Sequence, residues 1–279
     1  MAEAIVQLKD KYGNDLHFGH LGDMLIPAFP GIPDFRQNKA DIRAMHVKPD
    51  DVIITGFPKS GTHWNHQIAK MLLAGSAEYH SDIDSLRDFL EANQVKQGDN
   101  PPGSPPRVFR THLKFHHLPQ QILESKAKVI YLTRNPKDTW VSYYAFAHGR
   151  NDRVHYGGTW SQFFDLMISG FGYLYGDWFD HVRDWENVMH TQTQVPIFPS
   201  EFEDLKKDPV GQILKLDEFL GTHRGRPLCQ QIADACSFPA LKKVKDTEMR
   251  EKTMKQLFKD GSSGYYRKGE VGDWKNWFT

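Results

Sequence analysis

Residues 51–64 read DVIITGFPKSGTHW, a β-branched run followed by a loop between two glycines and the start of an apolar-faced segment. The run predicts a buried strand, and the segment after Gly61 predicts a helix. A strand, a glycine-bounded loop and a helix in this order are the context that a phosphate-binding loop requires. Backbone N–H groups at the start of such a helix point at an anion, with the positive end of the helix dipole behind them. The stretch therefore predicts an anion site, although a plain glycine turn remains an alternative for the motif alone.

The lysine of this loop does not stand where nucleoside-triphosphate enzymes have it. Those loops place Lys directly after the second glycine, whereas Thr62 follows Gly61 here and Lys59 lies earlier in the loop. The sequence also has no clear apolar run that ends in an acid able to hold magnesium. The layout for metal-assisted phosphoryl transfer is therefore missing.

The rest of the chain alternates short β-branched runs with helical patterns. Strands are predicted at 51–57, 107–112, 128–134 and 195–202, and helices at 61–75, 135–146 and 208–221. Alternating strands and helices are typical of an α/β fold. We expect one domain over residues 1–279, with a central, mainly parallel sheet of about five strands flanked by helices and ligands bound at the carboxyl ends of the strands. The glycine- and proline-rich stretch 94–107 is interpreted as a surface loop or lid, with a domain linker as the alternative.

Composition limits the classes of partner. Of 279 residues, 39% are hydrophobic and 25% charged, and 35 Lys+Arg balance 35 Asp+Glu, which favours neither nucleic acid nor an anionic membrane as a partner. No apolar run is long enough to span a bilayer, and the first residues do not read as a signal peptide. Cys229 and Cys236 lie seven apart in a predicted helix, roughly 10 Å, which is too far for a disulfide. We therefore expect a cytoplasmic protein with reduced thiols.

Two further segments carry candidate functional residues. RTHL at 110–113 ends a predicted strand and places a cation two residues before His112, although a single histidine is more often structural. YRKGEVGDWKNWFT at 266–279 combines adjacent cations with glycines, which suits a loop folded over a phosphate. By composition alone, this second segment also fits a solvated tail.

Taken together, these segments resemble the cytosolic sulfotransferases. The likeness rests on TGFPKSGTHW at 55–64, YLTRNPKDTWVSYY at 131–144 and RKGEVGDWKNWFT at 267–279, and it extends from about residue 29 to the end. The resemblance implies transfer of a sulfuryl group from 3′-phosphoadenosine-5′-phosphosulfate to a hydroxyl or amine of a small, mostly apolar acceptor, without a metal. The second product is adenosine 3′,5′-bisphosphate. The family's short dimerisation motif is not recognisable in KVKDTEMREKTMKQLF at 243–258, so a homodimer is possible but not indicated.

The resemblance also implies roles for individual residues. Lys59 matches the residue that stabilises the leaving phosphate, His112 the general base, and Arg134 with Ser142 the pair that binds the 3′-phosphate, Ser142 being counted among the catalytic residues as well. Arg110 and Phe146 match positions on the acceptor side. The other positions that match donor contacts are Ser60, Gly61, Thr62, His63, Trp64, Phe202, Cys236, Ser237, Phe238, Tyr266, Arg267, Lys268 and Gly269.

Four of these positions depart from the family pattern. His63 replaces a threonine hydroxyl of the loop, and Arg110 stands where a lysine is usual. Phe202 replaces a tyrosine that faces the adenine, and Cys236 replaces a threonine. These changes leave the transfer chemistry in place, but each affects a donor or acceptor contact.

Two other functions stay open at this point, namely a kinase on a similar loop and a nucleotide-binding homologue without activity. The departures would be signs of decay in the second case, whereas retained Lys59, His112 and Ser142 favour catalysis. The acceptor also stays open among phenols, steroids, other alcohols and amines. Five aromatic residues are candidates either for an apolar acceptor pocket or for the core: Phe18, Phe29, Phe35, Phe146 and Tyr156. The stretches 94–107 and 149–158 are candidate gates of that pocket.

Overall fold

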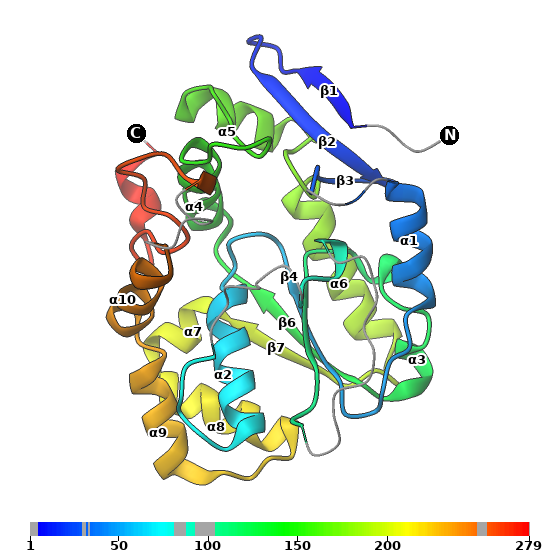
Figure 1. Cartoon of the computed structure of the whole chain (residues 1–279), viewed down its shortest axis with the longest axis vertical. Helices are drawn as coiled ribbons and strands as arrows, with labels where there is room; N and C mark the ends of the chain where they lie inside the picture. Colours follow the sequence, from blue (N-terminus) through cyan, green and yellow to red (C-terminus); the bar gives the residue numbers. More distant parts are fainter. Residues whose placement is uncertain are drawn as a thin grey trace.

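The computed structural model describes residues 5–29, 32, 34–80, 88–92, 104–249 and 256–278. Most of the 94–107 loop and part of the 243–258 stretch lie outside these residues, so the interpretations placed on them are not tested. Figure 1 shows the arrangement of the chain, with a small N-terminal sheet at one end and helices α8 and α9 at the other.

The central sheet is built from four parallel strands in the order β5-β4-β6-β7. Their bounds are β4 Val52–Gly56, β5 Val108–Thr111, β6 Lys128–Thr133 and β7 Ile197–Glu201. The four strands lie inside the four predicted segments, and their parallel pairing confirms the expected fold class. Every residue of β4 and β5 is buried, which explains why these strands read as continuous apolar runs rather than alternating ones. Among the described residues the sheet has four strands, against about five expected, and a parallel bridge between Phe89 and Arg110 lies on the outer side of β5.

A second, antiparallel sheet was not predicted. It contains β1 Val6–Lys9, β2 Asp15–Leu21 and β3 Met24–Pro27. A two-residue turn of Gly22 and Asp23 joins β2 to β3, since Leu21 pairs directly with Met24. This hairpin packs on α1 Phe35–Ala44 and leads the chain back to the main sheet.

Helices cover both faces of the central sheet and divide the core into two clusters. One cluster joins the N-terminal sheet to the face of the central sheet that carries Ile53 and Val129. The other contains Ile54, Ile68, Met71 and Leu72, so the predicted apolar face of the helix after Gly61 is confirmed. The helices are α2 Thr62–Ala74, α3 Ile122–Ser125, α4 Pro136–His148, α5 Trp160–Ile168, α6 Trp178–Thr191, α7 Phe202–Lys207, α8 Pro209–Leu220, α9 Gly225–Ala235 and α10 Phe238–Met249, with short 3-10 turns η1 Leu90–Ala92, η2 Phe115–His117 and η3 Asp273–Asn276.

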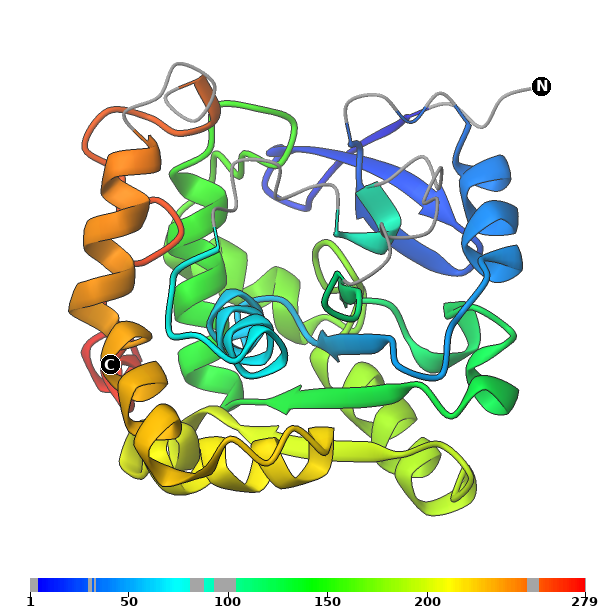
Figure 2. The same cartoon turned by 60° about the horizontal axis from the view of Figure 1, so that its bottom comes forward.

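The helix ends follow the sequence signals. α2 ends at Gly75, whose φ of 71° suits a residue without a side chain, and α4 and α8 each begin with proline. Cys229 and Cys236 are buried and unpaired, as expected. Figure 2 shows α10 and the C-terminal segment lying beside α4, which brings the end of the chain to the carboxyl edge of the central sheet.

Candidate active site

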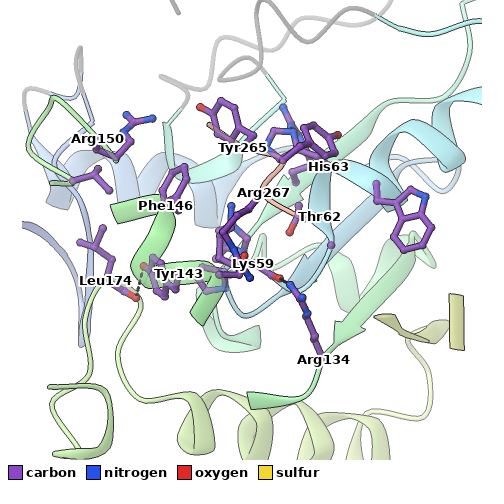
Figure 3. Close-up of a pocket in the computed structure, with 18 of the residues that line it drawn as sticks. Lys59, Thr62, His63, Arg134, Tyr143, Phe146, Arg150, Leu174, Tyr265 and Arg267 are labelled. Carbon is purple, nitrogen blue, oxygen red and sulfur yellow. Dashed lines mark hydrogen bonds between the residues drawn. The ribbon is translucent and has the colours of Figure 1, made fainter. Parts of the chain in front are cut away.

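The carboxyl ends of the four parallel strands lie along one edge and supply the predicted site. Because Gly56 pairs with Leu132 and Thr133 pairs with Glu201, the residues that follow these strands are held at the same level. A cavity of about 610 Å³ opens at this edge, and Figure 3 shows part of its lining. This edge is where ligands bind in open α/β sheets.

The loop after β4 has the geometry of an anion cradle. Gly61 precedes α2 with a φ of 105°, and Lys59 has a φ of 72°, which is rare for a residue with a side chain. Such strained conformations occur at binding sites where the surroundings enforce them. In the described part of the chain, the hydroxyls of Ser60 and Thr62 are buried without a hydrogen-bond partner. Both hydroxyls can therefore donate hydrogen bonds to a bound anion.

Lys59 lies among other cations. Burial, together with the nearby charges of Arg134, Arg150 and Arg267, lowers the pKa of its ammonium to about 7. The ammonium rests 4.3 Å from the centre of the Phe146 ring. Figure 3 shows Lys59 between Arg134 on one side and Phe146 and Tyr143 on the other. No carboxylate of the described residues is among the groups that shift the pKa of Lys59, so the cations around it fit a bound anion with several charges.

His112 is held in one tautomer by its neighbours. Its Nδ1 lies 2.7 Å from the carbonyl oxygen of Gly56, and since a carbonyl only accepts, Nδ1 carries the proton and donates it. Nε2 therefore bears the free lone pair. Burial, together with the charges of Lys59 and Arg110, lowers the pKa of His112 to about 3. The imidazole is thus neutral at physiological pH, as a proton acceptor must be.

Further groups fix the position of His112, and the sequence did not single them out. The Glu91 carboxylate accepts a hydrogen bond from the backbone N–H of His112 at 2.6 Å, and burial raises the pKa of that carboxyl to about 7. The rings of Phe89 and Tyr175 pack edge-on against the imidazole at 5.3 and 5.1 Å. His181 Nε2 lies 3.1 Å from the His112 carbonyl oxygen and donates to it. Both the backbone and the ring of His112 are therefore constrained.

The cations expected at the 3′-phosphate come from two distant segments. Arg134, directly after β6, donates from its guanidinium to the carbonyls of Lys59 at 3.0 Å and Glu270 at 3.3 Å. Arg267 is held by the Asp273 carboxylate at 2.6 Å. The Nε atoms of Arg134 and Arg267 are buried and have no hydrogen-bond partner among the described residues. Ser142 lines the same cavity from α4.

Two buried carboxylates anchor the C-terminal segment against the site. Asp138 of α4 accepts from the backbone N–H groups of Gly272 at 2.6 Å and Trp274 at 2.9 Å. Asp273 accepts from the Lys268 ammonium at 2.6 Å. This segment is therefore a packed structure, and the interpretation of 266–279 as a solvated tail is wrong for the residues that the structure describes.

Aromatic residues line the cavity on the side expected for the adenine. Trp64 packs edge-on against Phe202 at 5.5 Å, and the Arg134 guanidinium lies 4.1 Å from the centre of the Phe202 ring. Trp64 also packs against the apolar cluster around α2, so its side chain contacts the core as well as lining the cavity. Gly269 has a φ of 65°, and a Cβ there would come within 2.2 Å of the Phe238 ring. Only glycine fits at that position.

Two of the four departures from the family pattern contact each other. Arg110 Nη1 lies 3.0 Å from His63 Nδ1. Because the guanidinium only donates, His63 Nδ1 accepts and the His63 proton sits on Nε2. The His63 ring also packs against Tyr265, with ring centres 5.0 Å apart.

The candidate aromatic residues of the acceptor side divide into two groups. Phe29 and Phe146 line the cavity, whereas Phe18, Phe35 and Tyr156 are buried in the core. Arg150 also borders the cavity, paired with the Asp152 carboxylate. Residues 150, 152, 153 and 154 line the cavity, so the 149–158 stretch borders the site, and its role as a gate stays a prediction.

Of the predicted site residues that the structure describes, all except Ser60 and Ser237 line the cavity. Ser60 lies buried within the loop, and Ser237 directly precedes α10. Sequence reasoning missed Phe89, Tyr175, Tyr265 and Arg150 as lining residues. Tyr265 adjoins a predicted residue and Arg150 lies in a predicted gate, whereas no local pattern marks Phe89 or Tyr175. Throughout the described residues, each helix is too short or too polar to cross a lipid bilayer.

Comparisons with known proteins agree with this geometry. A sulfotransferase domain model matches residues 49–279. Sulfotransferase 1C2 of Oryctolagus cuniculus is 34% identical over 258 residues, which cover 87% of this chain and 82% of that protein. Sulfotransferase 1A1 of Bos taurus is 35% identical over 266 residues, which cover 91% of this chain and 86% of that protein.

Solved structures share the fold. Mouse sulfotransferase SULT7A1 complexed with PAP has a TM-score of 0.68 at 24% identity and covers 98% of this chain and 89% of its own. Retinol dehydratase in a complex with retinol and PAP has a TM-score of 0.70 at 19% identity, over 99% of this chain and 86% of its own. The domain match over most of the chain and the identity to the mammalian enzymes show that this chain belongs to the sulfotransferase family.

Proposed function

We propose that this chain transfers a sulfuryl group from 3′-phosphoadenosine-5′-phosphosulfate to a hydroxyl or amine of a small, mostly apolar acceptor. The observation that carries the proposal is a set of buried donors from the loop after β4, the end of β6 and the C-terminal segment. Among the described residues, Ser60 Oγ, Thr62 Oγ1, Arg134 Nε and Arg267 Nε are buried without partners, and Lys59 lies among them. These groups fit a nucleotide with phosphate charges at two positions.

The proposed roles divide between the two sides of the cavity. The donor supplies an activated sulfuryl group when bound. His112 Nε2 takes the proton of the acceptor hydroxyl, and the acceptor oxygen forms a bond to sulfur while the bond from sulfur to the bridging oxygen breaks. The Lys59 ammonium stabilises the negative charge that develops on the leaving phosphate. Preorganised charge of this kind is often the largest catalytic contribution.

We assign donor recognition to the other residues that match the sulfotransferase pattern. Arg134, Ser142 and Arg267 would hold the 3′-phosphate, for which an arginine fork is well suited. Trp64 and Phe202 would contact the adenine, with stacking worth about 1–3 kcal/mol. Lys268 and Gly269 would close over the 3′-phosphate. The other donor positions given under Sequence analysis would complete the binding surface.

Three further points belong to the proposal. Phe29, Phe89 and Phe146 would form the apolar wall for the acceptor, because all three line the cavity and the Phe89 ring packs against His112. The whole chain would form one domain, since the cavity combines residues from Pro27 to Gly269. The unpaired buried cysteines support a reducing, cytoplasmic location.

The test is isothermal titration of the metal-free protein with adenosine 3′,5′-bisphosphate, ATP and adenosine 5′-monophosphate. Selective binding of the bisphosphate supports the proposed 3′-phosphate site and justifies an acceptor screen with labelled donor. Absence of binding, or equal binding of ATP, contradicts it. Turnover that requires magnesium would favour a kinase instead.

A further inference from the structure

A second group of chemically active side chains lies outside the sulfotransferase cavity. Asp23 lies in the turn between β2 and β3, and His116 and His117 lie in η2. In the described part of the chain, one carboxylate oxygen and one nitrogen from each imidazole all lie within 4.8 Å of one another. The contributing segments are more than 90 residues apart in sequence, so the fold itself brings them together.

The three ligand atoms converge on a small volume. Asp23 Oδ1 lies 2.6 Å from His117 Nε2 and 3.2 Å from His116 Nε2. Tetrahedral zinc, with ligands at about 2.0–2.1 Å, separates its ligand atoms by roughly 3.3 Å. The Asp23 side chain is 63% exposed, so a small rotation of this carboxylate gives room for an ion between the three atoms.

The orientation of the two imidazoles also favours a shared ligand. Neighbouring residues in a chain usually direct their side chains apart, yet the two rings lie 4.0 Å apart and aim the same nitrogen at the same oxygen. His117 is 1% exposed and fixed by packing, whereas His116 is 51% exposed and reaches the point from solvent. A single histidine would suffice to pair one carboxylate.

We propose that Asp23, His116 and His117 form a binding site for a zinc-type divalent cation, separate from the sulfuryl-transfer site. Two imidazoles and one carboxylate are a ligand set that suits zinc, and water can fill the fourth position from the solvent side. Oxygen-seeking ions such as magnesium prefer carboxylates, carbonyls and water to imidazoles. The Lys39 ammonium also borders Gly22 and opposes a cation there, so we expect moderate rather than tight binding.

A bound ion would link the β2–β3 hairpin to the segment that contains η2. The β2–β3 hairpin leads through β3 to Pro27, Ala28 and Phe29 of the cavity, and η2 follows the strand that ends before His112. An ion between Asp23 and the two histidines would tie these segments together. We therefore expect the ion to raise the thermal stability of the protein, because it binds the folded state and not the unfolded chain.

The experiment uses the full chain, free of any affinity tag and treated with a chelator, titrated with Zn²⁺ and separately with Co²⁺. We expect one saturable Zn²⁺ site, Co²⁺ absorption bands of tetrahedral type, and a higher Tm with Zn²⁺. Asp23→Asn and His116→Ala change exposed side chains and leave the core intact. Each should weaken Zn²⁺ binding by at least about tenfold, the range seen when metal sites lose even a supporting group.

The matched control is His223→Ala, which removes an exposed histidine 3.2 Å from Glu218, a surface pair that no third ligand joins within the described ranges. It should leave Zn²⁺ binding unchanged. Absence of saturable binding, or binding that survives either ligand substitution, overturns the proposal. Binding of adenosine 3′,5′-bisphosphate should be the same in all three variants, so this result is independent of the test of the transfer function.

Discussion

Arg110 Nη1 and His63 Nδ1 lie 3.0 Å apart. Both residues differ from the usual sulfotransferase sequence pattern. The arginine side chain is almost fully buried, and the contact sets the tautomer of the histidine beside the anion loop. The two departures therefore act as one unit rather than as two independent losses.

This coupling predicts the outcome of a double-mutant cycle. His63→Thr and Arg110→Lys should each weaken binding of adenosine 3′,5′-bisphosphate, because each leaves the other partner without its contact. The double variant should lose less than the sum of the two, with a coupling energy of about 1 kcal/mol or more. Calorimetric titration of the four proteins measures it, and strictly additive effects would show that the two residues act separately.

Donor binding should be linked to proton uptake at Lys59. Its pKa of about 7 in the free protein is lowered by burial and by Arg134, Arg150 and Arg267. An anion beside the ammonium raises this pKa, so binding takes up a proton above pH 7, and affinity falls as pH rises through 7 and above. Titration at pH 8 in buffers of different ionisation enthalpy measures the uptake. Lys59→Met should abolish the proton uptake and should lower kcat by about 10²–10³-fold. Proton uptake that persists in this variant would mean that a group other than Lys59 takes up the proton.

Removal of the general base should lower the rate without a matching loss of donor binding. His112→Ala should lower kcat on a neutral alcohol by about 10²–10⁴-fold. His223→Ala, at an exposed position in the loop between α8 and α9, serves as the histidine control. Steady-state kinetics with labelled donor measure both variants, and near-full turnover of His112→Ala would refute the assigned role.

Arg267 should report on the 3′-phosphate alone. Arg267→Ala should weaken binding of adenosine 3′,5′-bisphosphate by about 10–100-fold, the value of one hydrogen bond to a charged group. Adenosine 5′-monophosphate, which lacks that phosphate, should bind the variant and the parent protein alike. Arg183→Ala, from an exposed ion pair, is the matched control. Equal losses for both nucleotides would mean that Arg267 acts by holding the fold of the segment.

Glu91 should make the protein less stable as the pH rises. Burial raises its pKa to about 7 from an ordinary value of 4.5, so the unfolded chain ionises first and the folded state loses stability between these two pH values. Glu91→Gln lacks this penalty and should gain stability relative to the parent protein from pH 4.5 to 7, by on the order of 3 kcal/mol. Chemical denaturation at several pH values measures the difference, with the exposed Glu124→Gln as control. If the difference in free energy of unfolding between the two proteins does not change with pH, the raised pKa of Glu91 is contradicted.

The sequence allowed more of the donor side to be predicted than of the acceptor side. Lys59, Arg134 and Gly269 lie in segments that match the sulfotransferase pattern, and the structure brings these segments together around one cavity. Phe89 and Tyr175 carry no such local signal, although they pack on His112 from distant parts of the chain. The N-terminal sheet was also missed, because β1 and β3 are only four residues long and β2 packs on α1, a contact that no local pattern marks.

By itself, the sequence determined the parallel strands, the loop after Gly56 and the helix ends, because buried β-branched runs, glycine conformations and proline positions act over a few residues. Only the tertiary structure decided which polar groups meet. The contact of Arg110 with His63, the orientation of His112 by Gly56 and the convergence of Asp23 with two histidines all join residues that are 40 or more positions apart. Such contacts depend on strand order and helix packing, which no local pattern encodes.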